Sequence, residues 1–171
     1  LLAQRRFPEA LAKTEEAMRY RSDQAEAVVL RGRALAGLGR HSDASEAFAR
    51  ADRMDRAAID RGDGREDWAV ALARSGRFDE AAAQFRRLVA SATLAASRAR
   101  FKAALGLCLL QLGPDKIEDA IAAARDALLD DRNLLLARWA LVLGLDRSRP
   151  ARGSSGWTEL EGARVDLPEA G

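Results

Sequence analysis

The feature that most constrains the fold is a motif that recurs along the chain. Each copy has a turn, the start of a helix, a small residue and then a larger or apolar residue four positions later. The copies begin near Arg5, Gly39 and Gly76, and a looser one begins at Gly113. Their small residues are Ala10, Ala44, Ala81 and Ala120, with 34 residues from Ala10 to Ala44 and 37 from Ala44 to Ala81. Repeats of this length are typical of stacked helix pairs, since one pair alone cannot bury its apolar face.

A second helical pattern precedes the turn glycine of the later copies. Apolar residues recur there at spacings of three, four and seven, which places them on one helical face. A small residue lies seven positions before each turn glycine, at Gly32, Ala69 and Gly106. We expect a partner helix to cross at these positions, because only a minimal side chain permits close approach. The turn glycines themselves supply the positive φ that ends the first helix.

These patterns predict helices throughout the first 146 residues and no sheet. The expected ranges are 8–20, 24–38, 42–60, 64–75, 78–91, 95–112, 115–130 and 133–146, and Leu1–Gln4 is expected to end a preceding helix. The last range is apolar nearly all round, with Trp139 among its leucines. A terminal helix of a stack normally presents a polar outer face, so we expect something to cover this one.

The motif resembles the tetratricopeptide repeat, in a divergent form of bacterial type. The resemblance covers about residues 1–145 and implies an all-α fold: a right-handed superhelical solenoid of antiparallel helix pairs, with about three to four repeats. Arg5 stands where a turn glycine is usual, and the proline that usually closes each repeat is absent. Sel1-like or other helical repeats therefore stay open. We assign residues 1–149 to the repeat domain and 150–171 to a Gly/Ser/Pro-rich linker and C-terminal tail.

In such a stack the first helix of each pair lines the concave face, where a partner would bind. The expected partner-binding residues are Glu26, Val29, Arg33, Glu66, Val70, Arg74, Arg100, Leu107 and Gln111. This surface suits an amphipathic helix or an extended segment with aliphatic anchors. The alternative is that Val29, Ala103 and Leu107 only pack within the stack. Some family members clamp a peptide carboxylate with Asn and Lys, and Asn133 is the only asparagine here.

The sequence offers no recognisable catalytic, cofactor or metal constellation. His41 and Cys108 are the only residues of their kinds, and we expect them to be a helix-start residue and a buried apolar residue. Arg61-Gly62-Asp63 spells an integrin-binding tripeptide, which is expected by chance in so arginine-rich a chain. Charges of both signs are interleaved, with a net charge of +2, which argues against a nucleic-acid surface. No apolar run is long enough to span a membrane.

The tail has its own apolar side chains. Trp157, Leu160, Val165 and Leu167 follow the linker in an otherwise polar stretch. We predict that the tail docks with Trp157 as its main anchor, either on the last helix or on a neighbouring subunit. Self-association through the last helix or the tail follows from the second arrangement.

The sequence therefore predicts a protein-interaction scaffold that binds a peptide or helix of a partner protein and is not an enzyme. The alternative is a regulatory or targeting domain of a larger enzyme. The chain lacks an initiator methionine, so we expect it to be part of a longer protein. The compartment stays open: the cytoplasm is slightly favoured, and the periplasm is the alternative if a leader precedes Leu1.

Overall fold

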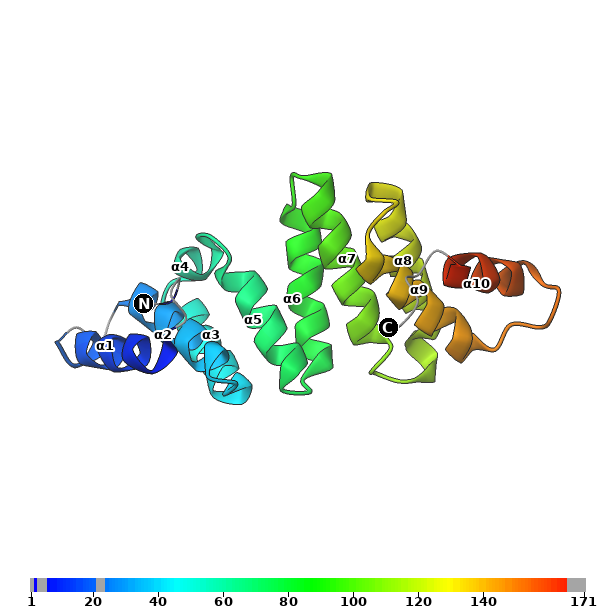
Figure 1. The fold of residues 1–171 in the computed structure, drawn as a ribbon. Helices are drawn as coiled ribbons and strands as arrows, with labels where there is room; N and C mark the ends of the chain where they lie inside the picture. The colour runs from blue at the N-terminus through cyan, green and yellow to red at the C-terminus, as the bar shows by residue number, and fades with distance from the viewer. Residues whose placement is uncertain (1, 3–5, 21–23, 166–171) are drawn as a thin grey trace. The chain divides into compact units, whose positions relative to one another are not determined.

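The computed structural model describes residues 2, 6–20 and 24–165, and every regular element among them is helical (Figure 1). The elements are α1 (Phe7–Tyr20), α2 (Ala25–Gly37), α3 (His41–Met54), α4 (Arg56–Asp60), α5 (Gly64–Arg74), α6 (Phe78–Ser91), α7 (Ala95–Leu109), the 3₁₀ turn η1 (Pro114–Lys116), α8 (Ile117–Asp130), α9 (Leu135–Ser148) and α10 (Ser155–Val165). The all-helical prediction is confirmed.

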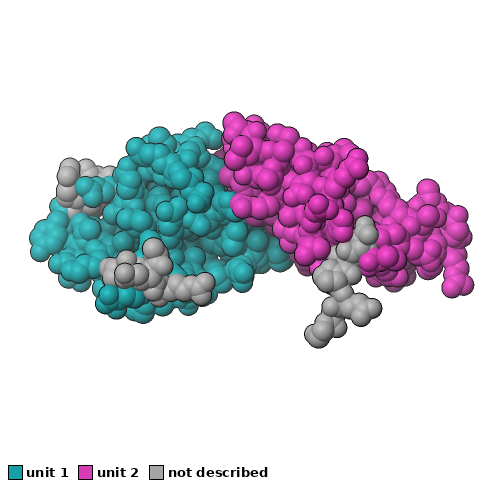
Figure 2. Space-filling view, turned by 45° about the horizontal axis from the view of Figure 1, so that its top comes forward, with its two compact units in different colours: residues 1–84 teal, residues 85–171 magenta. Residues whose placement is uncertain are grey.

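The chain divides into two compact units, residues 1–84 and 85–171, which Figure 2 colours separately. The boundary falls within α6. In the first unit α2 packs against α1 and α3, and α3 packs against α5. In the second unit α7, α8 and α9 pack against one another, and α10 packs against α9. We call α2, α5, α7 and α9 the first helices, since each opens a helix pair.

The core of the first unit is built where helices cross. Phe48, Leu35 and Leu72 are fully buried. A Cβ added at Gly32 would lie 2.8 Å from the ring of Phe48. The ring of Phe48, on α3, therefore occupies the space that a side chain at Gly32 of α2 would need. The second unit has a similar close approach of two helices at Gly106, where an added Cβ would lie 3.1 Å from the carbonyl oxygen of Ala120. The predicted close crossings therefore exist at both glycines.

The turns between paired helices use glycine for its backbone freedom. Gly39 has φ +76° and Gly76 has φ +81°, and an added Cβ at either would meet nothing within 4 Å. Glycine is required here by the left-handed conformation and not by lack of space.

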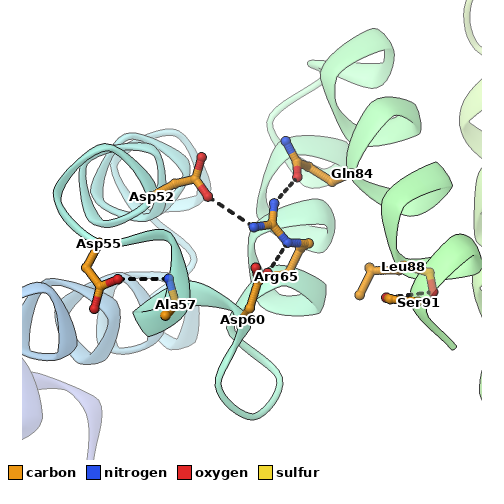
Figure 3. Close-up of polar contacts among 8 residues, drawn as sticks. All are labelled: Asp52, Asp55, Ala57, Asp60, Arg65, Gln84, Leu88 and Ser91. Carbon is orange, nitrogen blue, oxygen red and sulfur yellow. Dashed lines mark hydrogen bonds and ion pairs between the residues drawn. The ribbon is translucent and has the colours of Figure 1, made fainter. Parts of the chain in front are cut away.

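The predicted single helix over 42–60 is wrong. α3 ends at Met54, and Asp55 is extended, with φ −154° and ψ 106°. Its carboxylate accepts a hydrogen bond from the Ala57 amide at 2.9 Å (Figure 3), which starts the short helix α4 as an N-cap. Ile59 of α4 is fully buried, and this burial holds the extra element in place.

Other helix ends differ from the predicted ones by a few residues. α7 ends at Leu109, three residues early, and Pro114 begins a 3₁₀ turn before α8. α10 lies in the stretch that the sequence marked only as linker and tail. The segment Leu1–Gln4 falls outside the described residues except for Leu2, which lies in a turn, and Leu167 of the tail also falls outside them.

Candidate functional site

The first-helix surface of the first unit is held together by an ion pair. Arg33 of α2 donates from Nε to Asp67 Oδ2 of α5 at 2.6 Å, and both side chains are about one-third exposed. Burial raises the pKa of Asp67, and the hydrogen bond from Arg33 opposes that rise. Arg33, expected to face a partner, therefore links two helices of the unit.

Glu26 is also engaged within the unit. It is exposed, and Arg61, which follows α4, forms an ion pair with it. Arg61 lies 3.3 Å from Asp55 as well. The tripeptide Arg61-Gly62-Asp63 is thus part of a turn, with φ +64° at Gly62, and its arginine pairs with carboxylates of its own chain.

The remaining first-helix positions of this unit differ in exposure. Val29 is only 5% exposed, so its alternative role inside the stack is the one that the structure shows, and the adjacent Leu30 is 41% exposed. Val70 is 40% exposed, and Arg74 is exposed. Glu66 is half-buried and has an interaction partner. The side chains most open to a partner are Leu30, Val70 and Arg74.

In the second unit α9 exposes a continuous apolar surface. The side chains of Leu135, Leu136, Trp139 and Leu143 are between 36% and 47% exposed, and helical periodicity places all four on one side of α9. We call these residues the α9 strip. Every other helix in the described part of the chain exposes one such large apolar side chain at most. From the sequence we expected this apolar helix to be covered, by the tail or by a second copy, and the four residues of the strip remain exposed in this structure.

The predicted residues of α7 and the turn that follows lie in this second unit. Arg100 is exposed, and its guanidinium carbon lies 5.7 Å from the ring centroid of Phe101. Gln111 is exposed. Leu107 is half-buried and packs against the apolar cluster beneath α10, while Ala103 is fully buried. The alternative that these residues only pack within the stack therefore holds fully for Ala103 and partly for Leu107.

The charges on α7 are all positive. Arg98, Arg100 and Lys102 are its charged residues. Asp130, the last residue of α8, accepts hydrogen bonds from Arg98 at 2.7 and 3.0 Å and lies 2.8 Å from Lys102 Nζ. These two cations lower the pKa of Asp130 to about 2. On α9, Arg147 donates to the carbonyl oxygen of Leu110 at 2.5 Å. The first helices of this unit therefore carry more cations than acids, and two of these cations, Arg98 and Lys102, are paired with Asp130.

A buried arginine lies in the first unit and is not a ligand site. Arg65 is 6% exposed, and its guanidinium donates to Asp60, to Gln84 at 2.8 Å and to Asp52 at 3.0 Å (Figure 3). Its guanidinium carbon also lies 6.0 Å from the ring centroid of Trp68. Each nitrogen has a partner within the chain, so this cluster joins α3, α4, α5 and α6.

His41 and Cys108 take the structural places expected of them. His41 is the half-buried first residue of α3 and borders an open cavity of about 330 Å³ that Arg74 also lines. Cys108 is buried, and burial raises the pKa of its thiol to about 11, so it is not a thiolate at neutral pH. Within residues 2, 6–20 and 24–165, no group of three or more His, Cys, Asp or Glu side chains could hold a metal ion. Nor does any helix in this part have the length and apolarity to cross a membrane.

The tail forms α10. Trp157, the predicted anchor, is half-buried, with the guanidinium carbon of Arg152 at 5.7 Å from its ring centroid. Leu160 is the residue of α10 that is buried, at 2% exposure, and it joins a cluster with Ile121 and Leu141. The sequence named Leu160 among the apolar tail residues but gave the anchoring role to Trp157.

Taken with the paired helices, the glycine turns and the close crossings, this surface defines a helical-repeat protein of the kind that binds other proteins. The sequence model of the tetratricopeptide repeat matches residues 1–59 and 66–133. The chain therefore belongs to the tetratricopeptide-repeat family, as its sequence motifs predicted. Members of this family generally serve as non-catalytic protein-interaction scaffolds, and this chain has that fold.

Solved structures support the same fold. MamA residues 41 to the end, from Desulfovibrio magneticus RS-1, is 19% identical with a TM-score of 0.77, covering 93% of this chain and 82% of that one. YrrB, described as a TPR protein with an unusual peptide-binding site, is 17% identical with a TM-score of 0.78, covering 95% of this chain and 79% of that one. No curated protein sequence matches the chain.

Proposed function

We propose that this chain is a scaffold that binds a segment of a partner protein, with the α9 strip as its principal contact. The observation that carries the proposal is the clustering of four large, exposed apolar side chains on one side of one helix. Scattered exposed apolar residues are ordinary, but a contiguous group rimmed by polar residues is typical of an interaction surface. Trp139 at its centre is of the residue type most enriched among energetically dominant contacts.

The charges on α7 and α9 indicate which kind of partner segment fits. α7 carries three cations and no acid, and α9 carries Arg138 and Arg147 against Asp146. A complementary segment is an amphipathic helix, or an extended peptide, with aliphatic anchors and acidic residues beside them. Peptide binding by YrrB, a protein of similar fold, supports a peptide-like ligand.

The other predicted residues have secondary roles in this proposal. Arg100 and Gln111 are exposed in the same unit as the α9 strip. Val70 and Arg74 offer a smaller apolar and cationic contact on the first unit. Glu26 and Arg33 pair with residues of their own unit, and Glu66 has an interaction partner. Val29 is buried within the first unit, and Leu107 packs within the second.

In this proposal the chain catalyses no reaction and binds neither nucleic acid nor a membrane interior. Its alternative role, as a regulatory or targeting domain of a larger enzyme, uses the same protein-binding surface. The full-length sequence separates the two, because a catalytic domain on the same chain would establish the second.

The test is capture of a partner by the whole chain and by matched variants. Leu143→Glu places a charge in the α9 strip, and Leu129→Glu places the same charge at an 82% exposed leucine of α8, outside the strip. We expect a partner identified with the unchanged protein to bind Leu129→Glu equally well. Its affinity for Leu143→Glu should fall at least about tenfold, since a charge in an apolar contact is costly to desolvate. Equal binding to both variants would place the contact elsewhere.

A further inference from the structure

The helix α10 lies in a groove formed by α8 and α9. Leu160 inserts among Ile121, Leu141 and Leu145 at the base of this groove. At the rim, Glu159 accepts two hydrogen bonds from Arg125 of α8, at 2.8 and 2.6 Å. We call this surface the α8–α9 groove. It recognises three things in its occupant: an aliphatic anchor, a carboxylate one residue before it, and a helical backbone that presents both.

α10 fills this groove with few contacts of its own. Among its eleven residues only Leu160 is buried, and Val165 is 83% exposed. Gly162 lies within the helix, yet an added Cβ there would meet nothing within 4 Å. Glycine weakens a helix unless a close approach requires it, and no such approach exists at this residue. α10 is therefore less stable than it would be with alanine at position 162, a residue for which there is space.

The fit between α10 and the groove is also incomplete. An open cavity of about 400 Å³ runs along the contact, lined by Leu128 and Leu141 on one side and by Gly162 and Ala163 on the other. Because this cavity is open to solvent, it can take larger side chains without any change in the core beneath it. An occupant with larger side chains at these two α10 positions would fill space that α10 leaves open.

The connection before α10 allows the helix to leave without disturbing α9. Arg149 ends α9 in a left-handed conformation with φ +50°, and Gly153 has φ +81°. Arg149, Ala151, Arg152 and Gly153 are exposed. An exposed segment with so few buried contacts opens at low cost compared with the helices of the core.

We propose that the α8–α9 groove is a second protein-binding site, which α10 occupies reversibly. The partner that fits is an amphipathic helix with an acid–leucine pair in the places of Glu159 and Leu160 and a side chain larger than alanine three positions after the leucine. α10 competes with this partner at the high effective concentration of a segment on the same chain. The groove lies on the side of α9 away from the α9 strip, so both sites can be filled together.

The experiment uses the full chain and a fluorescein-labelled peptide of residues 153–165 as the probe. The unchanged protein should bind the peptide weakly, because its own α10 holds the groove. Leu160→Ala loosens α10 and should bind the peptide at least tenfold more tightly. Adding Arg125→Glu to Leu160→Ala should remove that gain, since the peptide's glutamate then meets a carboxylate. Val165→Ala, a change at an exposed position of the same helix, should behave as the unchanged protein.

Hydrogen exchange and a second variant, Glu159→Arg, test whether α10 leaves the groove without a change in α9. In the unchanged protein the amides of α10 should exchange hydrogen at least a hundredfold faster than those of α9. If Leu160→Ala disturbs α9 itself, Glu159→Arg loosens α10 at the rim and should give the same gain in peptide binding. The proposal is overturned if α10 is as protected as α9, if the peptide binds the loosened and unchanged proteins equally, or if Arg125→Glu has no effect. Loss of α9-strip binding in Leu143→Glu tests a different surface, so the two proposals can fail separately.

Discussion

The two units are built from the same helix pairs but differ in what their first helices expose. In the first unit, Arg33 and Arg61 pair with carboxylates of their own unit, and Arg65 is buried against Asp52, Asp60 and Gln84. In the second unit, the first helices are mainly cationic, and α9 exposes four apolar side chains. Charges of the second unit are paired as well, since Asp130 holds Arg98 and Lys102, and Glu159 holds Arg125. The difference that remains is the α9 strip, because no helix in the described part of the first unit exposes more than one large apolar side chain.

The largest expected effect is at Arg65. Arg65→Ala removes three hydrogen bonds from one buried guanidinium and leaves the half-buried Asp52 without its cation. We expect the free energy of unfolding to fall by about 2–3 kcal/mol. Urea unfolding followed by circular dichroism measures this, and hydrogen exchange should assign the loss to residues 1–84. Arg40→Ala, which removes only an exposed ion pair with Asp43, should cost less than about 0.5 kcal/mol. Similar losses in both variants would contradict the role given to Arg65.

The helix crossings give the next effect. Gly32→Ala forces a Cβ to within 2.8 Å of the fully buried Phe48 ring, whereas Gly106→Ala brings one to 3.1 Å from a backbone oxygen. We expect Gly32→Ala to destabilise by about 1–2 kcal/mol and Gly106→Ala by less, because alanine's helix propensity offsets part of the strain. Gly162→Ala, where the Cβ meets nothing, should stabilise α10 by up to about 1 kcal/mol. Thermal unfolding of the three variants measures the order, and destabilisation by Gly162→Ala would show a contact that the structure lacks.

One carboxylate in each unit should respond oppositely to acid. Arg98 and Lys102 lower the pKa of Asp130 to about 2, from an ordinary value of 3.8. The folded state therefore holds this carboxylate ionised, and its stabilising effect is present above pH 4 and lost as the pH falls towards 2. Burial raises the pKa of Asp67, so its ionised form is less favourable in the folded state than in the unfolded state. Protonation of Asp67 at low pH therefore raises the free energy of unfolding.

Stability measured against pH tests this difference. Asp130→Asn should lower stability at neutral pH by about 1 kcal/mol and reduce the further loss between pH 4 and pH 2. Asp67→Asn should instead remove the gain in the free energy of unfolding that comes from protonating Asp67 as the pH falls. Parallel pH profiles for the two variants would mean that the two carboxylates have similar surroundings.

The smallest expected effect on stability is at Arg74. Arg74→Glu changes an exposed side chain and should alter the free energy of unfolding by less than about 0.5 kcal/mol. Arg33→Glu, at another first-helix position of the same unit, places a second carboxylate beside Asp67 and should cost about 1 kcal/mol. Partner affinity should fall less with Arg74→Glu than with Leu143→Glu. A larger loss with Arg74→Glu would move the main binding surface to the first unit.

The sequence predicted the fold well because its signals are local. Gly32 and Gly106 marked crossings, and Gly39 and Gly76 marked turns, because each serves a backbone requirement that few other residues meet. The break at Asp55 was missed because one aspartate in a helical pattern has two readings, a surface residue or an N-cap. The later burial of Ile59 decides between them, and burial depends on packing between helices.

The candidate site was harder to predict for the same reason. Helical periodicity gave the positions that face outward but not which of them are paired. Arg33 meets Asp67 across 34 residues of sequence, and periodicity carries no information about such a contact. In the tail, the four apolar residues showed that something docks. Whether Trp157 or Leu160 goes deeper depends on the shape of the groove that receives them.

The short helix α4 shows where this architecture tolerates changes in length. Its five residues lie between the second helix of one pair and the first helix of the next, and they alter the spacing of the repeats while the crossing at Gly32 stays intact. One residue inserted within α2 or α3 would instead rotate everything after it by about 100° around the helix axis. Phe48 would then turn out of the core. Codon insertions and deletions in this gene should therefore survive best in the exposed turn at residues 61–63 and be lost within the helices, so that the length of a repeat changes while the geometry of its helix pairing is kept.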